Sequence, residues 1–340
     1  MTRRRIALVL LVLVLVVTPV AGHVPSDPGD NDSPTFAVTV TDAAKSWSYY
    51  DEIDDGGAQY YRITVDEGER LKVSAFTPDD GPFTPSLVVM APEIDGDDAP
   101  PGVSVPDGMG AVVVEGERPA TPGYEPFAPS ANYETAAFER ASDGRTTYLV
   151  ALYEPANRSG RAGVAIGYQE SFTPAEYATV PFSLVDNRLW EGQPLALALG
   201  PFVLAVVGGV GVFARRRRHT SGKPVAESLL LGGGLLVLAS GVNTLVQTGL
   251  TLAATGPTAG ALVTAAYIVV PAICGGWAIR VAGRSQGRFD ARTRVGLAVA
   301  GLAALVTWAG FLVGPVLLIA AAVAPARFLE ASPTEWLADR

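Results

Sequence analysis

Histidine and cysteine, which most nucleophilic enzymes and zinc sites use, are scarce in this sequence of 340 residues. The only histidines are His23 and His219, and the only cysteine is Cys274. A Ser-His-Asp or Cys-His mechanism needs a histidine base beside its nucleophile, and a zinc cluster or a disulfide needs several cysteines. His23 lies near the start of the chain, His219 beside a run of arginines and Cys274 in an apolar segment. We therefore expect no enzyme activity and no cofactor.

Acidic clusters are the other candidates for chemistry. The stretches DEIDDGG, from Asp51, and EIDGDDAP, from Glu93, contain the carboxylates that Ca²⁺ prefers. Neither fits an EF-hand loop, because Ile53 occupies the second ligand position and the distal glutamate is absent. We expect solvated loops. No carboxylate pair stands out for glycoside hydrolysis, so a surface hydrolase or its accessory is only a second alternative.

Two asparagines, Asn31 and Asn157, lie in Asn-X-Ser sequons. In a secreted domain such a tripeptide marks an exposed turn that can carry a glycan. Asn157 lies between two expected strands and is the better candidate for glycosylation.

The start of the chain is typical of a secretory signal. Arginines at positions 3–5 precede an apolar core from Ile6 to Val17, and small residues follow up to Gly22. A basic start, a short apolar core and a small-residue exit predict a signal peptide over residues 1–22. Whether this segment is cleaved or retained as an anchor, residues 23–192 are expected on the outer side of the membrane.

Residues 23–192 predict an all-β, jelly-roll-like extracellular sandwich. Eight β-rich runs alternate with turns of Gly, Pro and Asp, and the last of them is ATVPFSL from Ala178. In the stretch QYYRITVDEGERLKVSAF, from Gln59, apolar and polar residues alternate on both sides of an Asp-Glu-Gly turn. This pattern predicts a β-hairpin with one wet face.

The same stretch carries a family resemblance. YYRITVDEGERLKVSAF, a later LVVMA strand and TTYLVALYEPANRSGRAGVAIGY together resemble the pre-peptidase C-terminal type of secreted β-sandwich. The resemblance covers about residues 45–170, and the PSLVVMA strand lacks the aspartate that is usual in the family. It implies an accessory binding or stabilising module without catalysis.

Charge divides the chain into two parts. Residues 23–192 contain 29 acidic and 10 basic side chains, and the whole chain has only three lysines. Acid-rich, lysine-poor surfaces keep proteins soluble where salt screens repulsion. This composition favours the cell surface of a halophilic archaeon.

Residues 193–324 predict an all-α bundle of four transmembrane helices, with the lipid bilayer as partner. The expected spans are 195–214, 228–255, 258–279 and 295–324. One face of the second span is polar and predicts helix–helix contacts or, alternatively, a polar conduit. Its residues are Ser240, Asn243, Gln247 and Thr251. Glycines in the first and fourth spans also suit close packing against a partner helix or a second copy.

Basic residues occupy alternate loops between these spans. They are Arg215, Arg216, Arg217, Arg218, Arg280, Arg284, Arg288, Arg292 and Arg294. Because positive loops stay inside, residues 23–192 and a short tail, residues 325–340, are expected outside. If the third helix continues past the membrane, the four-residue spacing from Arg280 to Arg292 places these arginines in a stripe on one helical face, where they would contact anionic lipid or an acidic cytoplasmic partner. Orientation by charge alone is the other interpretation of the same residues. Nucleic acid is not expected as a partner, because no basic soluble domain exists.

Together these features predict a membrane-anchored cell-surface protein. Its β-sandwich would bind a surface or envelope partner, and its helices would anchor it or assemble with other membrane proteins. A non-catalytic subunit of a transport or channel complex is the alternative.

Overall fold

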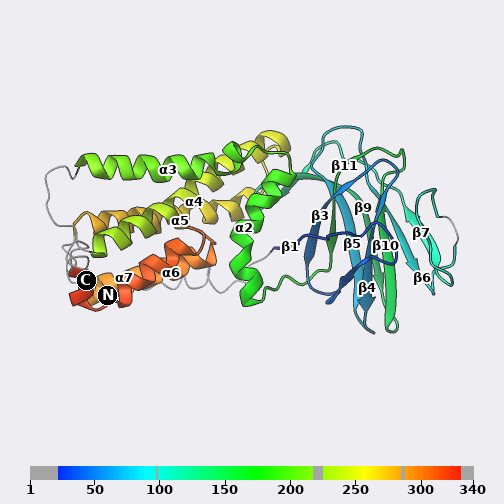
Figure 1. Ribbon diagram of the computed structural model, residues 1–340, viewed down its shortest axis with the longest axis horizontal. Helices are drawn as coiled ribbons and strands as arrows, with labels where there is room; N and C mark the ends of the chain where they lie inside the picture. Colours follow the sequence, from blue (N-terminus) through cyan, green and yellow to red (C-terminus); the bar gives the residue numbers. More distant parts are fainter. Residues whose placement is uncertain (1–21, 97–98, 217–224, 285–287, 331–340) are drawn as a thin grey trace.

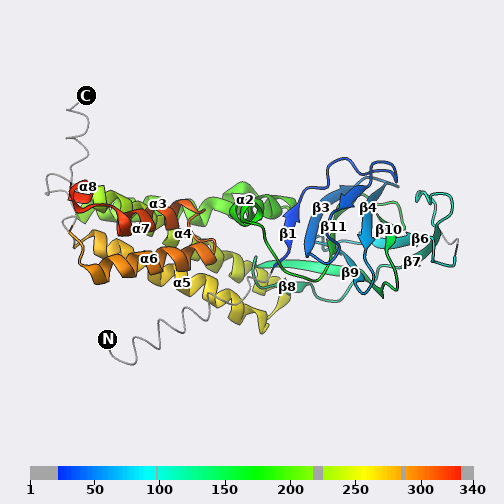
Figure 2. The same ribbon diagram turned by 90° about the horizontal axis from the view of Figure 1, so that it is seen from below.

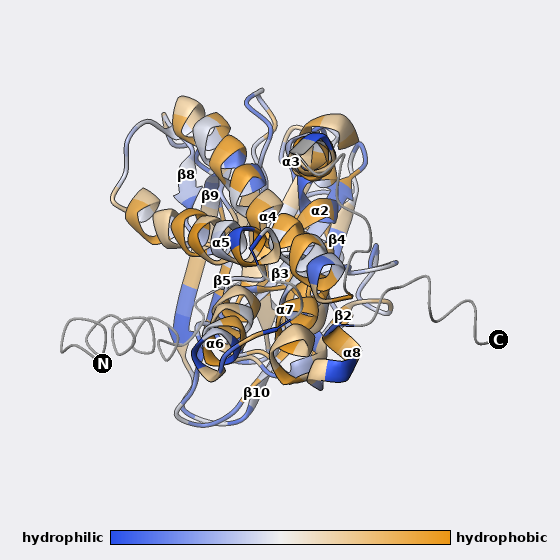
Figure 3. Ribbon diagram, turned by 90° about the vertical axis from the view of Figure 1, so that its left-hand side faces the viewer, coloured by the Kyte–Doolittle hydropathy of each residue, from blue (hydrophilic) through white to orange (hydrophobic). Residues whose placement is uncertain are grey.

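The computed structural model describes residues 22–96, 99–216, 225–284 and 288–330. The predictions for residues 1–21, for Arg217 and Arg218 and for residues 331–340 lie outside this part. Within it, two β-sheets precede seven helices, and the β region and the helices lie end to end (Figure 1). Most of the helical ribbon is hydrophobic when viewed from its far end (Figure 3). An N-terminal β region followed by apolar helices is the order that the sequence predicted.

The described strands form one sheet of six and one of five. In spatial order the first sheet contains β1 (Val24–Ser26), β3 (Trp47–Ile53), β11 (Gly160–Ile166), β5 (Arg70–Thr77), β9 (Ser130–Ala141) and β8 (Gly123–Glu125). The second contains β2 (Val38–Val40), β4 (Ala58–Val65), β10 (Thr146–Tyr153), β6 (Ser86–Ala91) and β7 (Gly110–Val114). Buried side chains of both sheets, such as Val73 and Val150, join in one hydrophobic cluster. This cluster is the core of the β region.

The hairpin predicted for residues 59–76 is wrong in its pairing. The alternation is confirmed for the core face, since Tyr61 in β4 and Val73 in β5 are both buried. The expected wet face is wrong at Tyr60, which is buried in a second hydrophobic cluster on the other side of β4. However, β4 pairs with β2 and β10, whereas β5 pairs with β9 and β11 in the other sheet. The turn at Gly68 thus carries the chain from one sheet to the other. Alternation shows which side chains are buried, and it leaves the hydrogen-bonding partner of each strand open.

A helix replaces the last predicted strand. The stretch ATVPFSL lies within α2 (Pro174–Trp190). Thr173 Oγ1 accepts a hydrogen bond from the backbone N–H of Glu176 at 3.3 Å, and the Glu176 carboxylate accepts one from the backbone N–H of Thr173 at 2.7 Å. This capping box and the proline that follows it start a helix, although the β-branched residues favoured a strand. The axis of α2 lies across those of the other long helices (Figure 1).

Three helices of the described part are long and apolar enough to cross a membrane. They are α3 (Leu195–Arg216), α4 (Val225–Thr255) and α5 (Gly260–Ala282), and they match the first three predicted spans. Helices α3 and α5 both begin beside the β region and end at the opposite end of the molecule (Figures 1 and 2). The basic residues in their last turns therefore lie far from the β region.

The fourth predicted span, residues 295–324, is wrong as a single helix. It consists of α6 (Ala291–Val306) and α7 (Val313–Val323). Together with α2 and the short helix that follows α7, which both lie outside the predicted spans, this division gives the described part seven helices in place of the expected four. Between them the backbone turns at Trp308, Gly310 and Phe311, which all have positive φ. An unbroken apolar run does not distinguish one long helix from two shorter ones that turn back, which is why hydropathy alone failed here.

Helix α7 runs back alongside α6. Arg294 Nη1, near the start of α6, donates hydrogen bonds to the carbonyl oxygens of Ala322 and Ala324, at 2.9 and 2.7 Å. The short helix α8 (Ala326–Glu330) follows at the end of the bundle remote from the β region (Figure 2). The sequence placed the tail after residue 324 on the same side as the β region. The described start of that tail lies at the opposite end, because α7 returns the chain.

The glycines of the fourth predicted span pack within the chain. A Cβ added to Gly314 would lie 2.9 Å from Val237 Cγ2, and one added to Gly310 would lie 3.2 Å from Val237 N. Both glycines therefore allow close approach to α4. By contrast, an added Cβ at Gly208 or Gly211 in α3 would meet nothing within 4 Å.

Candidate ligand-binding cavity between the β region and the helices

The β region contacts the membrane helices directly. The phenol of Tyr124, in β8, donates to Thr264 Oγ1 in α5 at 2.8 Å, and Thr264 Oγ1 donates to Pro126 O at 2.6 Å. Phe127 packs edge-on against Tyr267 of α5, with ring centroids 6.0 Å apart. The β region is thus docked on α5.

Helix α2 joins both parts. Its Trp190 donates an indole hydrogen bond to Asp51 O in β3 at 2.7 Å, and the Trp190 ring lies 5.0 Å from that of Tyr50. Its Tyr177 donates a hydrogen bond to Leu305 O in α6 at 2.9 Å. Because one end of α2 is held by the first sheet and the other by α6, the helix closes the space between them.

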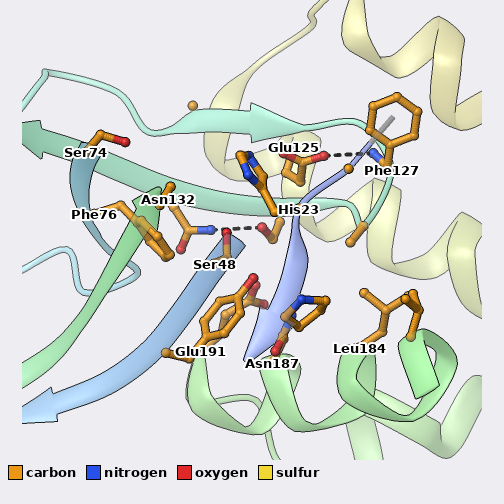
Figure 4. Close-up of a pocket in the computed structure, with 18 of the residues that line it drawn as sticks. His23, Ser48, Ser74, Phe76, Glu125, Phe127, Asn132, Leu184, Asn187 and Glu191 are labelled. Carbon is orange, nitrogen blue, oxygen red and sulfur yellow. Dashed lines mark hydrogen bonds between the residues drawn. The ribbon is translucent and has the colours of Figure 1, made fainter. Parts of the chain in front are cut away.

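A cavity of about 340 Å³ lies in that space, and we name it the junction cavity. Ser48 and Ser74 line it from the first sheet, Glu125 from the end of β8, Asn187 from α2, and Trp308 from the α6–α7 turn. Figure 4 shows the side chains of Ser48, Ser74, Glu125 and Asn187 around the same space. A pocket of this size, at a junction and lined by converging polar groups, is typical of a small-molecule site.

Some charged groups of the junction cavity are sheltered from solvent, whereas Lys72 and Glu134 are exposed. Arg188 Nη1 lies 3.0 Å from Glu191 Oε2, and their side chains are only 9% and 10% exposed. Glu125 accepts a hydrogen bond from the backbone N–H of Phe127 at 3.1 Å. Burial raises the pKa of Glu125, and it also raises the pKa of Glu191 although Arg188 opposes that shift. Both carboxyls therefore hold a proton more readily than exposed glutamates do.

A second cavity, of about 100 Å³, lies among the helices, and we name it the inner cavity. It shares Leu184, Arg188 and Trp308 with the junction cavity, so the two adjoin. Three buried polar atoms at its wall have no hydrogen-bond partner: Asn243 Oδ1, Gln247 Oε1 and Trp308 Nε1. Buried polar atoms are normally paired with protein or water, so these three suit a wet cavity or a bound polar group.

The predicted polar face of the second span is divided between four roles. Ser240 Oγ accepts a hydrogen bond from Gly310 N at 2.7 Å, and Gln247 Nε2 donates one to Leu197 O of α3 at 3.2 Å. Gln247 therefore makes a helix–helix contact of the expected kind, whereas Ser240 holds the α6–α7 turn against α4. Thr251 Oγ1 donates to the backbone of its own helix, and Asn243 lines the inner cavity.

The basic residues do not form the predicted helical stripe. Helix α5 ends at Ala282, so Arg284 and Arg288 follow the helix, and Arg292 belongs to α6. Arg288 Nε lies 3.2 Å from Glu330 Oε1 of α8. Arg215, Arg280, Arg284, Arg288 and Arg292 are all exposed, whereas Arg294 caps the end of α7. Arg216 ends α3. The exposed arginines nevertheless gather at the end of the bundle remote from the β region.

The two sequons differ in accessibility. Asn157 is exposed in the turn between β10 and β11, where its φ of 55° is in the left-handed region. Asn31 is only 1% exposed, and its Nδ2 lies 3.5 Å from Tyr60 O. The prediction that Asn31 carries a glycan is therefore wrong for the folded chain, because a tripeptide motif carries no information about burial.

The first acidic stretch also differs from the prediction. Asp51 to Ile53 lie in β3 and not in a loop. Burial raises the pKa of Asp51 to about 6, although its Oδ1 accepts a hydrogen bond from Glu52 N at 2.8 Å. Among the described residues, no three His, Cys, Asp or Glu side chains converge as metal ligands do.

Sequence reasoning missed the junction cavity. Its lining residues come from at least five separate segments, and no local motif connects Glu125, Arg188 and Trp308. One signal was readable: Thr-Pro-Ala-Glu from Thr173 is a helix-starting pattern and would have indicated α2, which forms one wall. No known protein family matches the chain, and no curated protein matches it either. The function is therefore argued from the junction cavity itself.

Proposed function

We propose that this chain is a membrane-anchored surface binding protein. Its β region faces the exterior, its apolar helices cross the membrane, and a component of the cell surface or envelope binds in the junction cavity. The observation that carries the proposal is that this cavity is built jointly by the first sheet, α2 and the α6–α7 turn. Occupancy of such a site would act on the β region and on the helices together.

Charge supports the orientation. The exposed arginines lie at the end of the helices remote from the β region, and basic residues remain on the inner side of a membrane. Helix α2 is suited to the outer interface, since it lies across the bundle and exposes Phe182 and Leu189. Halophilic origin and glycosylation at Asn157 fit the same placement.

Sidedness is tested by cysteine labelling. In a Cys274→Ala background, the variants Asn157→Cys and Arg284→Cys place single exposed thiols at opposite ends of the molecule. We expect a membrane-impermeant maleimide to label the first variant on intact cells, and the second only after the membrane is opened. Labelling of Arg284→Cys alone on intact cells would refute the orientation.

Binding is tested by photocrosslinking from the cavity. A photoreactive residue at Glu134, which is exposed and lines the junction cavity, is compared with one at Thr39, which is exposed on the second sheet. We expect a surface component to crosslink from position 134 and not from position 39. Equal capture from both positions, or none from position 134, would contradict a binding site in the junction cavity.

One observation favours a second candidate, a transport or channel subunit. Asn243 and Gln247, the residues named for a polar conduit, line the inner cavity with unpaired oxygens. On this second hypothesis, vesicles containing the purified protein leak small polar solutes, and Asn243→Leu reduces the leak. Wild-type vesicles that remain tight would leave only the binding function.

A further inference from the structure

The junction cavity exists because one patch of the first sheet carries small side chains. Ser48 of β3, Ala165 of β11 and Ser74 of β5 line it, and none of the three extends far from the sheet. Larger side chains surround the patch, including Tyr50 and Phe76. The small side chains leave a hollow in the surface of the sheet, and the aromatic side chains around it project further. This hollow has room for one small ligand.

Charge at this site is close to balanced. Lys72 and Arg188 line the cavity together with Glu125, Glu134 and Glu191. Arg188 and Glu191 already pair with each other, so their charges largely cancel. A strongly anionic ligand would meet two further carboxylates, and a strongly cationic one would meet Lys72. The balance favours a ligand without net charge.

Hydrogen-bonding capacity is mixed and partly unused. Asn132 donates to Ser130 Oγ at 2.9 Å, but its Oδ1 is buried and has no partner. The indole N–H of Trp308 has none either. The unpaired acceptor of Asn132 and the unpaired donor of Trp308, a residue that borders both cavities, suit hydroxyl groups, because each hydroxyl both donates and accepts.

Aromatic rings provide the remaining contacts. Phe172 packs edge-on against Trp308 at 5.8 Å, and both line the junction cavity together with Phe127. Ring faces pack well against the C–H surfaces of a compact apolar group. A ligand that combines hydroxyl groups with C–H surfaces therefore matches both the hydrogen-bonding groups and the aromatic rings that line the cavity.

We propose that the junction cavity binds a neutral, hydroxyl-rich ring of the sugar type. The ring belongs either to a glycolipid head group in the outer leaflet or to a soluble glycan. This inference rests on the proposed function only in taking the junction cavity as the binding site.

The test uses the purified full-length chain in phosphatidylcholine nanodiscs. Methyl glucoside and methyl mannoside, followed by calorimetry, probe the soluble source. Monoglucosyl diacylglycerol, compared with diacylglycerol by native mass spectrometry, probes the lipid source. We expect saturable binding in one arm, and preference for the glucosyl lipid over its parent if the source is the membrane.

Variants assign the binding to the cavity. Ala165→Phe fills the hollow in the sheet and is expected to weaken binding at least tenfold, whereas Asn132→Ala removes one acceptor and costs about fivefold. Ala141→Phe, at the exposed end of β9, is the matched control and should bind like wild type. If Ala165→Phe fails to fold, Asn187→Trp fills the same volume from α2.

Three results would overturn the inference. They are no saturable binding in either arm, wild-type affinity in the filled variants, and preference for tetramethylammonium or inorganic phosphate over every sugar probe. These measurements use purified protein, so they do not depend on membrane orientation. Failure here with successful crosslinking from position 134 would reject the sugar ligand alone, whereas failed crosslinking with sugar binding would reject the surface partner.

Discussion

Replacing Arg188 with methionine tests whether the junction depends on its buried ion pair. Arg188 and Glu191 lie 3.0 Å apart, and both side chains are at least nine-tenths buried. Methionine retains much of the apolar stem of arginine and removes its charge. Glu191 is then left buried without its ion-pair partner, with only the weaker influence of Arg161 remaining, and this poorly compensated charge sets the size of the effect.

The expected loss in the free energy of unfolding is large for a single substitution. Removing one partner of a buried pair costs about 3–5 kcal/mol, and we expect about 3 kcal/mol because both side chains border a cavity that water can enter. The double variant Arg188→Met/Glu191→Gln removes both charges and should recover most of that loss. Recovery distinguishes an uncompensated charge from a simple loss of packing.

The pH dependence of this loss has a definite sign. Burial raises the pKa of Glu191, and Arg188 lowers it, so the pKa rises further without Arg188. A carboxyl whose folded pKa exceeds its unfolded value destabilises the fold above the folded pKa, and this penalty disappears as the pH falls through it. The Arg188→Met variant should therefore approach wild type in acid.

Denaturant unfolding in detergent micelles, followed by near-ultraviolet circular dichroism, measures the effect. The four proteins of the cycle are compared at about pH 7 and about pH 4.5, which spans the carboxyl range. The reasoning is refuted if the double variant loses as much free energy of unfolding as the two single variants lose together. It is refuted equally if the loss in Arg188→Met is the same at both pH values.

Three further predictions concern single residues. Burial raises the pKa of Asp51 to about 6, so Asp51→Asn should stabilise the chain by about 1–2 kcal/mol above pH 6 and by nothing below about pH 4; unfolding curves with no pH-dependent gain would contradict this. Trp190→Ala should cost about 3–5 kcal/mol, whereas Trp190→Phe, which loses mainly the hydrogen bond to Asp51 O, should cost about 1 kcal/mol; equal losses in thermal unfolding would argue against ring packing. If the mature chain is glycosylated, Asn157→Gln should lower its mass by one glycan and Asn31→Gln should not, and the reverse result would place Asn31 at the surface.

Side-chain burial in the β region could be predicted from the sequence only in part. It follows a period of two in β5, but β6 is buried along its whole length, because residues such as Val103 cover the outer face of the second sheet. Tyr61 and Val73 are buried as their alternation requires. Strand pairing has no such local signature. The turn at Gly68 joins β4 and β5 across the two sheets, and the same residues could have formed a hairpin with the same buried face. Pairing depends on distant strands, which one local pattern does not identify.

The helical part shows the same limit in another form. The first three spans could be predicted because length and hydropathy suffice for a membrane crossing. The turn at Trp308 to Leu312 could not, since these residues are as apolar as the helices that flank them. The site depends on that turn, because it carries Trp308 into the junction cavity. Because the sequence predicted one continuous helix in place of α6, this turn and α7, the junction cavity could not be predicted either.

Trp308 gives the proposed coupling between ligand and helices a physical route. Its ring lies 5.3 Å from Tyr177 of α2 and 6.3 Å from Tyr267 of α5, and it lines both cavities. Its φ of 50° costs of order 1–3 kcal/mol for a side chain of this size, so the surrounding contacts must hold it in place. A ligand that contacts the indole would change those contacts. The strained turn would then relax or tighten against α4, where Ser240 accepts the hydrogen bond of Gly310 N.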